Sequence, residues 1–361
     1  MLQINDFQSV LSGKTVCVTG HTGFTGGWLV RWLSQLGCKI VGIGLPPLTT
    51  PSLFVSGDIE SLCHASHIGD ITDYEWLLQQ IKNSGAELIF HLAAQPLVRK
   101  SYRNPLETFA SNVMGTANVL EAARHTDGLK AAVIITTDKV YDNKEREAPY
   151  REDEALGGKD PYSASKACAE LVVASYQKTL SQMGNGIAVA SVRGGNIVGG
   201  GDWSEDRLIP DIYRAIVDEA TLNIRYPKAT RPWQHVLTAC HGYMAVGAAL
   251  LDAPQDVIGS WNVGPVDLRG YTVEEIVEKF TDVWTKPSVD FETDQPPEAM
   301  NLLVDTAKIK AHLGVASPWD IEAVIEKTAL WYKGFAGSEQ NGVDLMVEDI
   351  ASYRNKISGK T

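Results

Sequence analysis

The chain has 361 residues, of which 44% are hydrophobic and 21% charged, values close to the globular average that exclude a disordered or fibrous protein. Lys and Arg number 32 against 44 Asp and Glu, and the resulting net charge of −12 repels the phosphates of nucleic acids. We therefore expect no nucleic-acid partner.

The sequence shows no pattern of export, membrane insertion or metal binding. Residues 1–14, MLQINDFQSVLSGK, lack a basic start followed by an apolar stretch, and no window reaches the roughly 18 apolar residues that a membrane span requires. The cysteines, at positions 17, 38, 63, 168 and 240, are scattered and include no C-x-x-C pair. We expect a cytoplasmic protein with no metal and no membrane partner.

Apolar, β-branched runs alternate with stretches of helix length in the first half of the chain. The runs are apolar on both faces, as strands are when helices cover both sides of a parallel sheet. This pattern predicts an α/β protein with a Rossmann-like doubly wound parallel sheet. The predicted strands are Thr15–Thr19, Lys39–Ile43, Leu88–Leu92, Ala131–Thr137 and Ile187–Val192, and the predicted helices are Gly27–Leu36, Asp73–Lys82, Asn112–Arg124 and Ser163–Leu180.

After Gly194 the chain changes to Gly-rich and Pro-punctuated segments, GGNIVGGGDW and RYPKATRPWQHV. We interpret these segments as excursions from the sheet that contribute to a smaller, mixed α/β C-terminal substrate domain. Helices are expected at Leu208–Asp218, Leu237–Leu251, Val273–Trp284, Ala307–Leu313 and Ile321–Tyr332.

The first predicted strand runs into a glycine-rich turn, Gly20-His-Thr-Gly23-Phe-Thr-Gly26, ahead of a helix. Glycines let the backbone approach a pyrophosphate, and a helix N-terminus offers unpaired N–H groups to it. Three glycines at intervals of three are weak evidence alone, because an ordinary glycine turn has the same spacing. The position between strand and helix favours a dinucleotide site.

Two further groups carry reactive side chains. Tyr162 and Lys166 are four residues apart, so a helix places the phenol and the ammonium on one face. Positive charge is what a tyrosine needs to act as a base near neutrality, although a surface pair would have the same spacing. Thr137, Asp138 and Lys139 follow the fourth apolar run, at the edge where open α/β sheets place reacting groups. The three features together favour a catalytic site.

With these motifs the sequence resembles the extended short-chain dehydrogenase/reductase superfamily. The resemblance is carried by Gly20-x-x-Gly23-x-x-Gly26, Asp70-Ile71, His91-Leu92-Ala93-Ala94-Gln95 and Tyr162-x-x-x-Lys166. Within the superfamily the chain resembles nucleotide-sugar 4,6-dehydratases, most closely the members that act on CDP-glucose. The matching stretches are GHTGFTGGWL, HLAAQPLVRKSY, TDKVYDN, GGGDW, RLIPDI and RPWQHV.

The resemblance implies a redox-neutral lyase with tightly bound NAD, which is reduced and reoxidised in each turnover. Tyr162, assisted by Thr137 and Lys166, would take the proton of the sugar 4-hydroxyl while hydride leaves C4. The resulting ketone acidifies the C5 hydrogen, so water can leave across C5 and C6, with Asp138 as the candidate acid. Hydride then returns to C6 and gives a 4-keto-6-deoxy sugar.

Lys139 distinguishes this chain from part of the family. The dTDP-glucose and GDP-mannose enzymes carry Glu there and use it as the C5 base, whereas the CDP-glucose members resemble this chain in having Lys. A lysine is protonated near neutrality, so action as a base needs desolvation or a nearby cation. The ammonium could instead stabilise the developing enolate. We hypothesise that Lys139 is the C5 base, and the sequence leaves both roles open.

The resemblance also implies binding residues. For the cofactor they are Gly20, Gly23, Phe24, Thr25, Gly26, Asp70, Ile71, Leu92, Ala93, Ala94, Ser111, Tyr162 and Lys166. For the nucleotide sugar they are Gln95, Thr137, Asn196, Arg207, Leu208, Ile209, Arg231 and Asn262, with Arg231 on the diphosphate. Pro46 and Pro47 stand where a ribose-binding carboxylate is usual, which weakens the preference for NAD over NADP. A second diphosphate arginine of the dTDP enzymes is missing near Asn301.

The resemblance further implies two domains and a homodimer. A discontinuous dinucleotide-binding domain would comprise residues 1–194 and 232–265, and a nucleotide-sugar-binding domain residues 195–231 and 266–361. The homodimer would form through the helices at Asn112–Arg124 and Ser163–Leu180.

Three alternatives remain at this point. The chain could act on GDP-mannose or dTDP-glucose, or it could be a sugar 4-epimerase or decarboxylase, which would need neither Asp138 nor Lys139. It could also be a catalytically silent dinucleotide sensor, but such a protein has no need of Thr137, Tyr162 and Lys166.

Overall fold

The computed structural model describes residues 6–182, 186–267, 269–291, 301–337 and 341–359. Within them, one parallel sheet has the strand order β11-β6-β5-β4-β1-β2-β3. Successive strands are added on one side of β1 up to β3 and then on its other side from β4 onward, so the strand order switches between β1 and β4. This order confirms the predicted doubly wound α/β fold. The strands are β1 (Thr15–Thr19), β2 (Lys39–Gly44), β3 (Ala65–Ile68), β4 (Leu88–His91), β5 (Ala131–Ile135), β6 (Ala188–Gly194) and β11 (Gly259–Val263).

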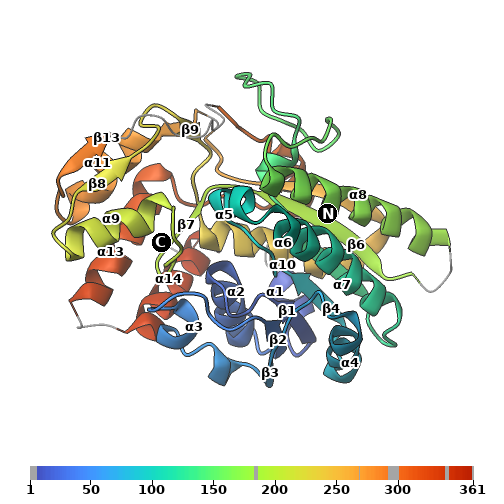
Figure 1. The fold of residues 1–361 in the computed structure, drawn as a ribbon. Coiled ribbons are helices and arrows are strands. Elements are labelled where there is room, and N and C mark those ends of the chain that lie inside the picture. The colour runs from blue at the N-terminus through green and yellow to red at the C-terminus, as the bar shows by residue number, and fades with distance from the viewer. Residues whose placement is uncertain (1–5, 183–185, 268, 292–300, 338–340, 360–361) are drawn as a thin grey trace.

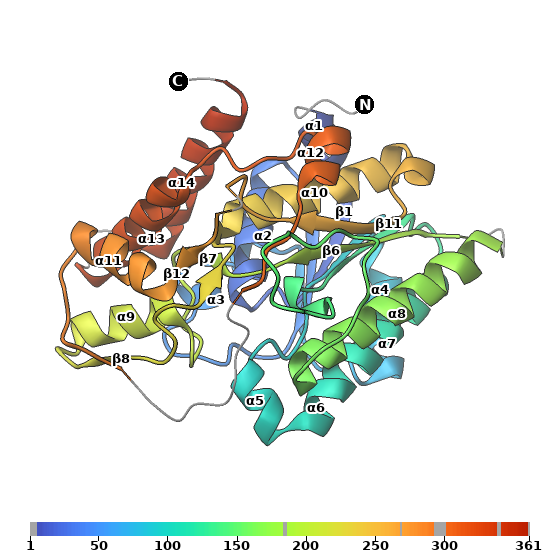
Figure 2. The same ribbon diagram turned by 90° about the horizontal axis from the view of Figure 1, so that it is seen from above.

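Helices cover both faces of the sheet (Figure 1, Figure 2). One face carries α4 (Tyr74–Ser84), α7 (Gly115–Arg124) and α8 (Pro161–Gln182). The other carries α1 (Asp6–Leu11), α2 (Phe24–Gln35), α10 (Val236–Asp252) and α12 (Ala307–Leu313).

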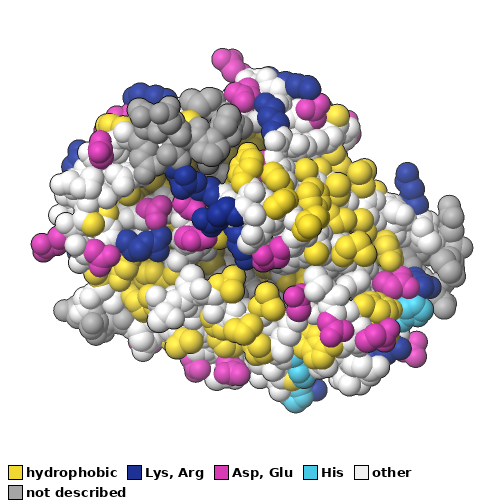
Figure 3. All heavy atoms as spheres, in the orientation of Figure 1, with side chains coloured by type: hydrophobic (Ala, Val, Ile, Leu, Met, Phe, Trp, Pro, Cys, Tyr) yellow, Lys and Arg dark blue, Asp and Glu magenta, His cyan; other side chains and the backbone are white. Residues whose placement is uncertain are grey.

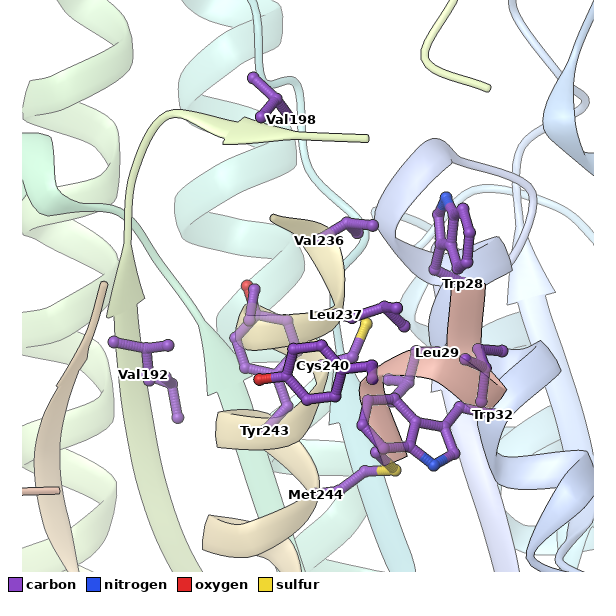
Figure 4. Packing of buried hydrophobic residues seen from close by; sticks show 14 of the residues in the cluster. Trp28, Leu29, Trp32, Val192, Val198, Val236, Leu237, Cys240, Tyr243 and Met244 are labelled. Carbon is purple, nitrogen blue, oxygen red and sulfur yellow. The ribbon is translucent and has the colours of Figure 1, made fainter. Parts of the chain in front are cut away.

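Strand β1 shows why the apolar runs have no polar face. Successive side chains of a strand point to opposite faces, so Val16 and Val18 join one core cluster and Cys17 joins the other. In the first cluster α10 lies between β6 and α2 (Figure 4). Each large apolar side chain buried in this way contributes roughly 1.5–3 kcal/mol. The sheet therefore forms a rigid frame for the strand ends.

The two edge strands of the sheet, β3 and β11, were not predicted. β3 is only half-buried, and β11 includes Ser260 and Asn262, so neither forms a continuous apolar run. The helix predicted from Asn112 begins with a π-helical turn, η2 (Ala110–Met114). Short helices that the pattern did not predict are α1, α3 (Leu53–Ser56), α5 (Val98–Arg103), α6 (Pro105–Phe109), η1 (Glu60–Leu62), η3 (Asp138–Val140) and η4 (Pro254–Asp256).

A second group of elements lies beyond the carboxyl ends of β5 and β6. It contains strand pairs β7 with β10, β9 with β12 and β8 with β13. Its members are β7 (Ile197–Val198), α9 (Leu208–Val217), β8 (Leu222–Ile224), β9 (Thr230–Arg231), β10 (Gln234–His235), β12 (Tyr271–Thr272), α11 (Val273–Val283), β13 (Val289–Phe291) and α13 (Ile321–Ala336). The final helix, α14 (Gly342–Ile357), contacts α2 and α3 as well as α13. The two-domain division stays a prediction.

Candidate active site

A cavity of about 600 Å³ lies between the strand ends of the sheet and the second group of elements. Its walls come from the segments after β4 and β5, the start of α8, the segment after β6, and α9 and β8. Lys and Arg side chains gather between α9 and α5 in the middle of the face shown in Figure 3. The cavity therefore joins the end of a parallel sheet, where such folds bind ligands, to a rim on which Lys and Arg side chains stand among Asp and Glu side chains.

The glycine turn packs against the segment that follows β4. Gly20 has φ +78°, and a Cβ there would lie 2.7 Å from the Ala93 amide nitrogen. A Cβ at Gly26 would overlap the Gly20 carbonyl. Gly23 is the N-cap of α2 and has no side chain to bond the first N–H groups of that helix. The turn thus keeps a bare backbone beside a helix N-terminus, as a pyrophosphate requires.

The predicted cofactor residues fall into two places. Thr25, Leu92, Ala94, Tyr162 and Lys166 line the cavity. The others lie outside its wall as the described residues form it; they are Gly20, Gly23, Phe24, Gly26, Asp70, Ile71, Ala93 and Ser111.

Asp70 and Ile71 follow β3 and precede α4. The Asp70 carboxylate is exposed and accepts a hydrogen bond from the Thr72 amide at 2.9 Å, while Asp73 caps α4. Ile71 is buried against Gly115 at the start of α7. The bare glycine turn and the cavity wall fit a dinucleotide.

Tyr162 and Lys166 lie on the first two turns of α8, and both are nearly fully buried. Thr137 lies close enough to the Tyr162 phenol to act on its pKa, and Lys166 Nζ donates to the Ile135 carbonyl at 3.1 Å. Desolvation raises the pKa of Tyr162 to about 12 and lowers the pKa of Lys166 to about 8. The predicted pair is therefore a buried phenol and ammonium at the end of β5.

Thr137, Asp138 and Lys139 point to different surroundings. Thr137 and Lys139 line the cavity, whereas the Asp138 carboxylate is completely buried behind it. Thr137 Oγ1 donates to Asp138 Oδ1 at 3.0 Å, and Asp138 Oδ2 has no hydrogen-bond partner among the described residues. A Cβ at Gly195 would overlap this carboxylate. A direct contact of Asp138 with a ligand therefore needs a change of its side-chain rotamer.

Most predicted substrate residues reach the cavity wall, namely Thr137, Asn196, Arg207, Leu208, Ile209 and Arg231. Gln95 and Asn262 do not. The Gln95 amide bonds Thr108 and the Leu97 backbone. Asn262 is fully buried in β11, where it accepts from the Tyr141 hydroxyl at 2.6 Å. In this structure both side chains form hydrogen bonds with other parts of the protein instead of facing the cavity.

Among the charged cavity residues that were not predicted, three form one cluster. Asp206, with φ +59°, accepts from Arg99 at 2.8 Å and from Arg225 at 3.4 Å, so it bridges α5 and the end of β8. Arg99 is part of the matching HLAAQPLVRKSY stretch, whereas Arg225 precedes the matching stretch RPWQHV. The contact of Arg99 with Asp206 joins residues 107 positions apart, and that of Arg225 joins residues 19 positions apart.

No group of metal-ligating side chains is present among the described residues. Within the same residues, no helix combines the length and the apolarity needed to cross a membrane.

The doubly wound sheet, the glycine turn and the buried Tyr-x-x-x-Lys pair define a member of the extended short-chain dehydrogenase/reductase superfamily. The family model described as GDP-mannose 4,6 dehydratase matches residues 17–328, and the chain belongs to this family.

Individual relatives agree with this assignment. The chain is 43% identical to a CDP-glucose 4,6-dehydratase of Salmonella typhimurium over 351 residues, 94% of this chain and 96% of that protein. It is similar to the crystal structure of the dTDP-glucose 4,6-dehydratase DesIV from Streptomyces venezuelae with NAD and TYD bound, at 25% identity and a TM-score of 0.78, over 90% and 98% of the two chains. The X-ray structure of Pal from Bacillus thuringiensis matches with 26% identity and a TM-score of 0.77, over 89% and 99%.

Proposed function

We propose that this protein converts CDP-D-glucose to CDP-4-keto-6-deoxy-D-glucose and water, with tightly bound NAD. The observation that carries the proposal is the convergence of Thr137, Lys139, Tyr162 and Lys166 on one cavity that also holds Arg231. The similarity to a CDP-glucose 4,6-dehydratase, with 43% identity over nearly the whole chain, supports the choice of nucleotide.

The cofactor would lie along the glycine turn, with Leu92, Ala94 and Thr25 on the cavity side. NAD supplies reversible hydride transfer when it is bound. Pro46 and Pro47 leave the end of β2 without a carboxylate, but no Lys or Arg stands there in sequence to favour the extra phosphate of NADP.

Tyr162 would remove the proton of the sugar 4-hydroxyl. Thr137 acts on its hydroxyl and lowers its pKa, and the ammonium of Lys166 lies one turn away on the same helix. Nearby positive charge stabilises a phenolate. The 4-ketone remains in the product, so the proton that Tyr162 takes does not return to the sugar O4 and has to pass to solvent before the next turnover.

Lys139 would remove the C5 proton, and Asp138 would protonate the leaving C6 hydroxyl. Lys139 is half-buried on the cavity wall, so it can reach a sugar ring there. Asp138 is linked to the cavity through the Thr137 hydroxyl. A 4-epimerase needs neither group, and their placement beside Thr137 favours elimination.

Arg207 and Arg231 would hold the diphosphate. Both are cavity residues, and a planar guanidinium can bind two phosphate oxygens at once.

We also propose that the protein is a homodimer. Leu106, Met114 and Leu171 are 84%, 57% and 62% exposed on α6, η2 and α8. These elements contact one another, and Figure 3 shows a broad hydrophobic surface over α5, α6 and α8. An apolar surface of this kind is typical of a protein interface.

A cytoplasmic location is proposed as well. All five cysteines are free thiols in the structure, which fits a reducing compartment.

The function can be tested with the purified full-length protein. CDP-glucose, dTDP-glucose, UDP-glucose and GDP-mannose are offered separately in D₂O without added reductant. A 4-keto-6-deoxy product with deuterium at C5, formed fastest from CDP-glucose, is expected. Turnover of none of them would contradict the proposal, and a preference for another nucleotide would correct the substrate.

A further inference from the structure

Three successive turns of α8 hold three consecutive residues at the end of β5. The helix side chains are four residues apart and therefore share one face. The pairs are Tyr162 with Thr137, Lys166 with Ile135, and Glu170 with Thr136. The first two pairs belong to the site described above. In the third, Thr136 Oγ1 donates to Glu170 Oε1 at 2.5 Å; Thr136 lines the cavity, whereas Glu170 lies outside its wall and has no role so far.

Glu170 also ties α8 to the two neighbouring strands. Its Oε2 accepts from Ser191 at 2.8 Å and from Arg193 at 2.8 Å on β6, and from Ser260 at 3.2 Å on β11. The Glu170 and Arg193 side chains are only 2% and 4% exposed. Burial opposes ionisation of the carboxyl, but Arg193 and the hydroxyl donors hold its pKa below the usual value. Such a buried pair is stabilising only with this many partners.

The same network continues to the cavity wall. Arg193 Nη1 donates to the Tyr141 hydroxyl at 3.1 Å, and Tyr141 donates to Asn262 at 2.6 Å. Tyr141 follows Lys139 by two residues and lines the cavity. The network therefore holds the chain on both sides of residues 137–139, at Thr136 and at Tyr141.

We propose that Glu170 is a positioning residue that fixes the catalytic face of α8 against the end of β5 and keeps a negative charge one helical turn from the Lys166 ammonium. The inference rests on the proposed function. Glu170 does not touch the cavity, so it would act only through Thr136 and Lys166.

The charges around the site support the second part of this role. Burial lowers the pKa of Lys166, and the Glu170 carboxylate opposes that shift. The other titratable groups that act on Tyr162 and Lys166 are His91 at the end of β4, Asp138 after β5, Asp160 before α8, Arg207 before α9 and Tyr243 on α10. Without the carboxylate, Lys166 would lose its proton at lower pH.

The experiment compares pH profiles of kcat/KM for CDP-glucose in the NAD-loaded full-length protein. Glu170→Gln is expected to move the alkaline limb to lower pH by about one unit or more. This is the size of the effect that a unit charge one helical turn away has on the pKa of a buried ammonium such as Lys166. We expect its kcat to fall about 100-fold with little change in KM, because small displacements of catalytic groups lower the rate by about this factor. Thr136→Val, which keeps the charge, is expected to lower kcat without moving the limb.

Asp349→Asn is the control, because it also removes a largely buried carboxylate that is paired with a cation. Asp349 lies on α14, 3.5 Å from Lys327, and its variant is expected to keep the wild-type profile. A folded Glu170→Gln protein with a wild-type limb and kcat would overturn the proposal. If that variant does not fold, an unchanged kcat in Thr136→Val overturns it instead. An inactive wild-type protein contradicts the proposed function and this inference together, whereas an active wild type with unaffected variants contradicts only the inference.

Discussion

Tyr162 and Lys166 lie one turn apart on α8, and burial acts on them in opposite directions. It raises the pKa of the phenol to about 12 and lowers the pKa of the ammonium to about 8. Desolvation disfavours the charged form of each group, but a phenolate and an ammonium at this range stabilise one another. The pair therefore works only while Lys166 keeps its proton.

This relationship predicts an alkaline limit of activity. Lys166 is protonated below a pH of about 8 and neutral above it, so kcat/KM should fall as the pH rises through that value. Lys166→Met should lack this limb and lose about 10²–10⁴-fold in kcat, the usual contribution of proton-transfer groups. Steady-state rates from pH 6 to 10 provide the measurement. A wild-type profile that stays level to pH 10 would rule out this role of Lys166.

Lys139→Ala tests the C5 base. We expect kcat to fall by about 10²–10⁴-fold and exchange of the C5 hydrogen with D₂O to stop, because no proton acceptor faces the ring. NMR of the recovered sugar nucleotide measures the exchange. The control is Lys159→Ala, which removes another cavity lysine that is paired with Glu145 at 3.4 Å. Exchange that persists in Lys139→Ala would leave only the role of an enolate-stabilising ammonium.

Gly195→Ala tests the placement of Asp138. The new Cβ would overlap the Asp138 carboxylate, which must then move. We expect kcat to fall at least tenfold, because the acid and its hydrogen bond with Thr137 are displaced. Gly264→Ala is the control, since its Cβ would meet ordinary contacts at 3.4 and 3.5 Å. Equal kcat values for the two variants would show that the elimination does not depend on the Asp138 position.

Gly26→Ala tests the dinucleotide site by binding rather than by turnover. Its Cβ would overlap the Gly20 carbonyl and force the turn apart. The variant should therefore be purified without the NAD that the wild type retains, as measured by absorbance of the heat-released nucleotide. Gly337→Ala, where the nearest atom would be 3.5 Å away, should retain it. NAD retained by Gly26→Ala at the wild-type level would argue against this site.

Leu171→Arg tests the homodimer. A charge on the exposed apolar face of α8 should convert the dimer to a monomer in light scattering, because burying an unpaired guanidinium is costly. Leu330→Arg places the same charge at a 45% exposed leucine on α13 and should leave the dimer intact. A wild-type monomer at micromolar concentration would contradict the proposal directly.

Local pattern explains how much of the fold could be predicted. β1 has the predicted bounds, and α12 does too, because periodicity and flanking glycines are properties of one segment. The edge strands β3 and β11 escaped prediction because half-buried, polar strands show no such periodicity. The Tyr162–Lys166 pair was predictable for the same local reason, a spacing of four residues on a helix.

The sequence by itself determined the parallel sheet, the glycine turn and the identity of the reactive side chains, since each depends on residues close together in the chain. Only the tertiary structure decided that Asp138 faces Gly195 rather than the cavity and that Asn262 is held by Tyr141. Only the tertiary structure also places Glu170 in an ion pair with Arg193, and Asp206 in hydrogen bonds with both Arg99 and Arg225. These contacts link segments from different strands and helices, and their partners are selected by packing and by the need to satisfy buried charges, which no local pattern records.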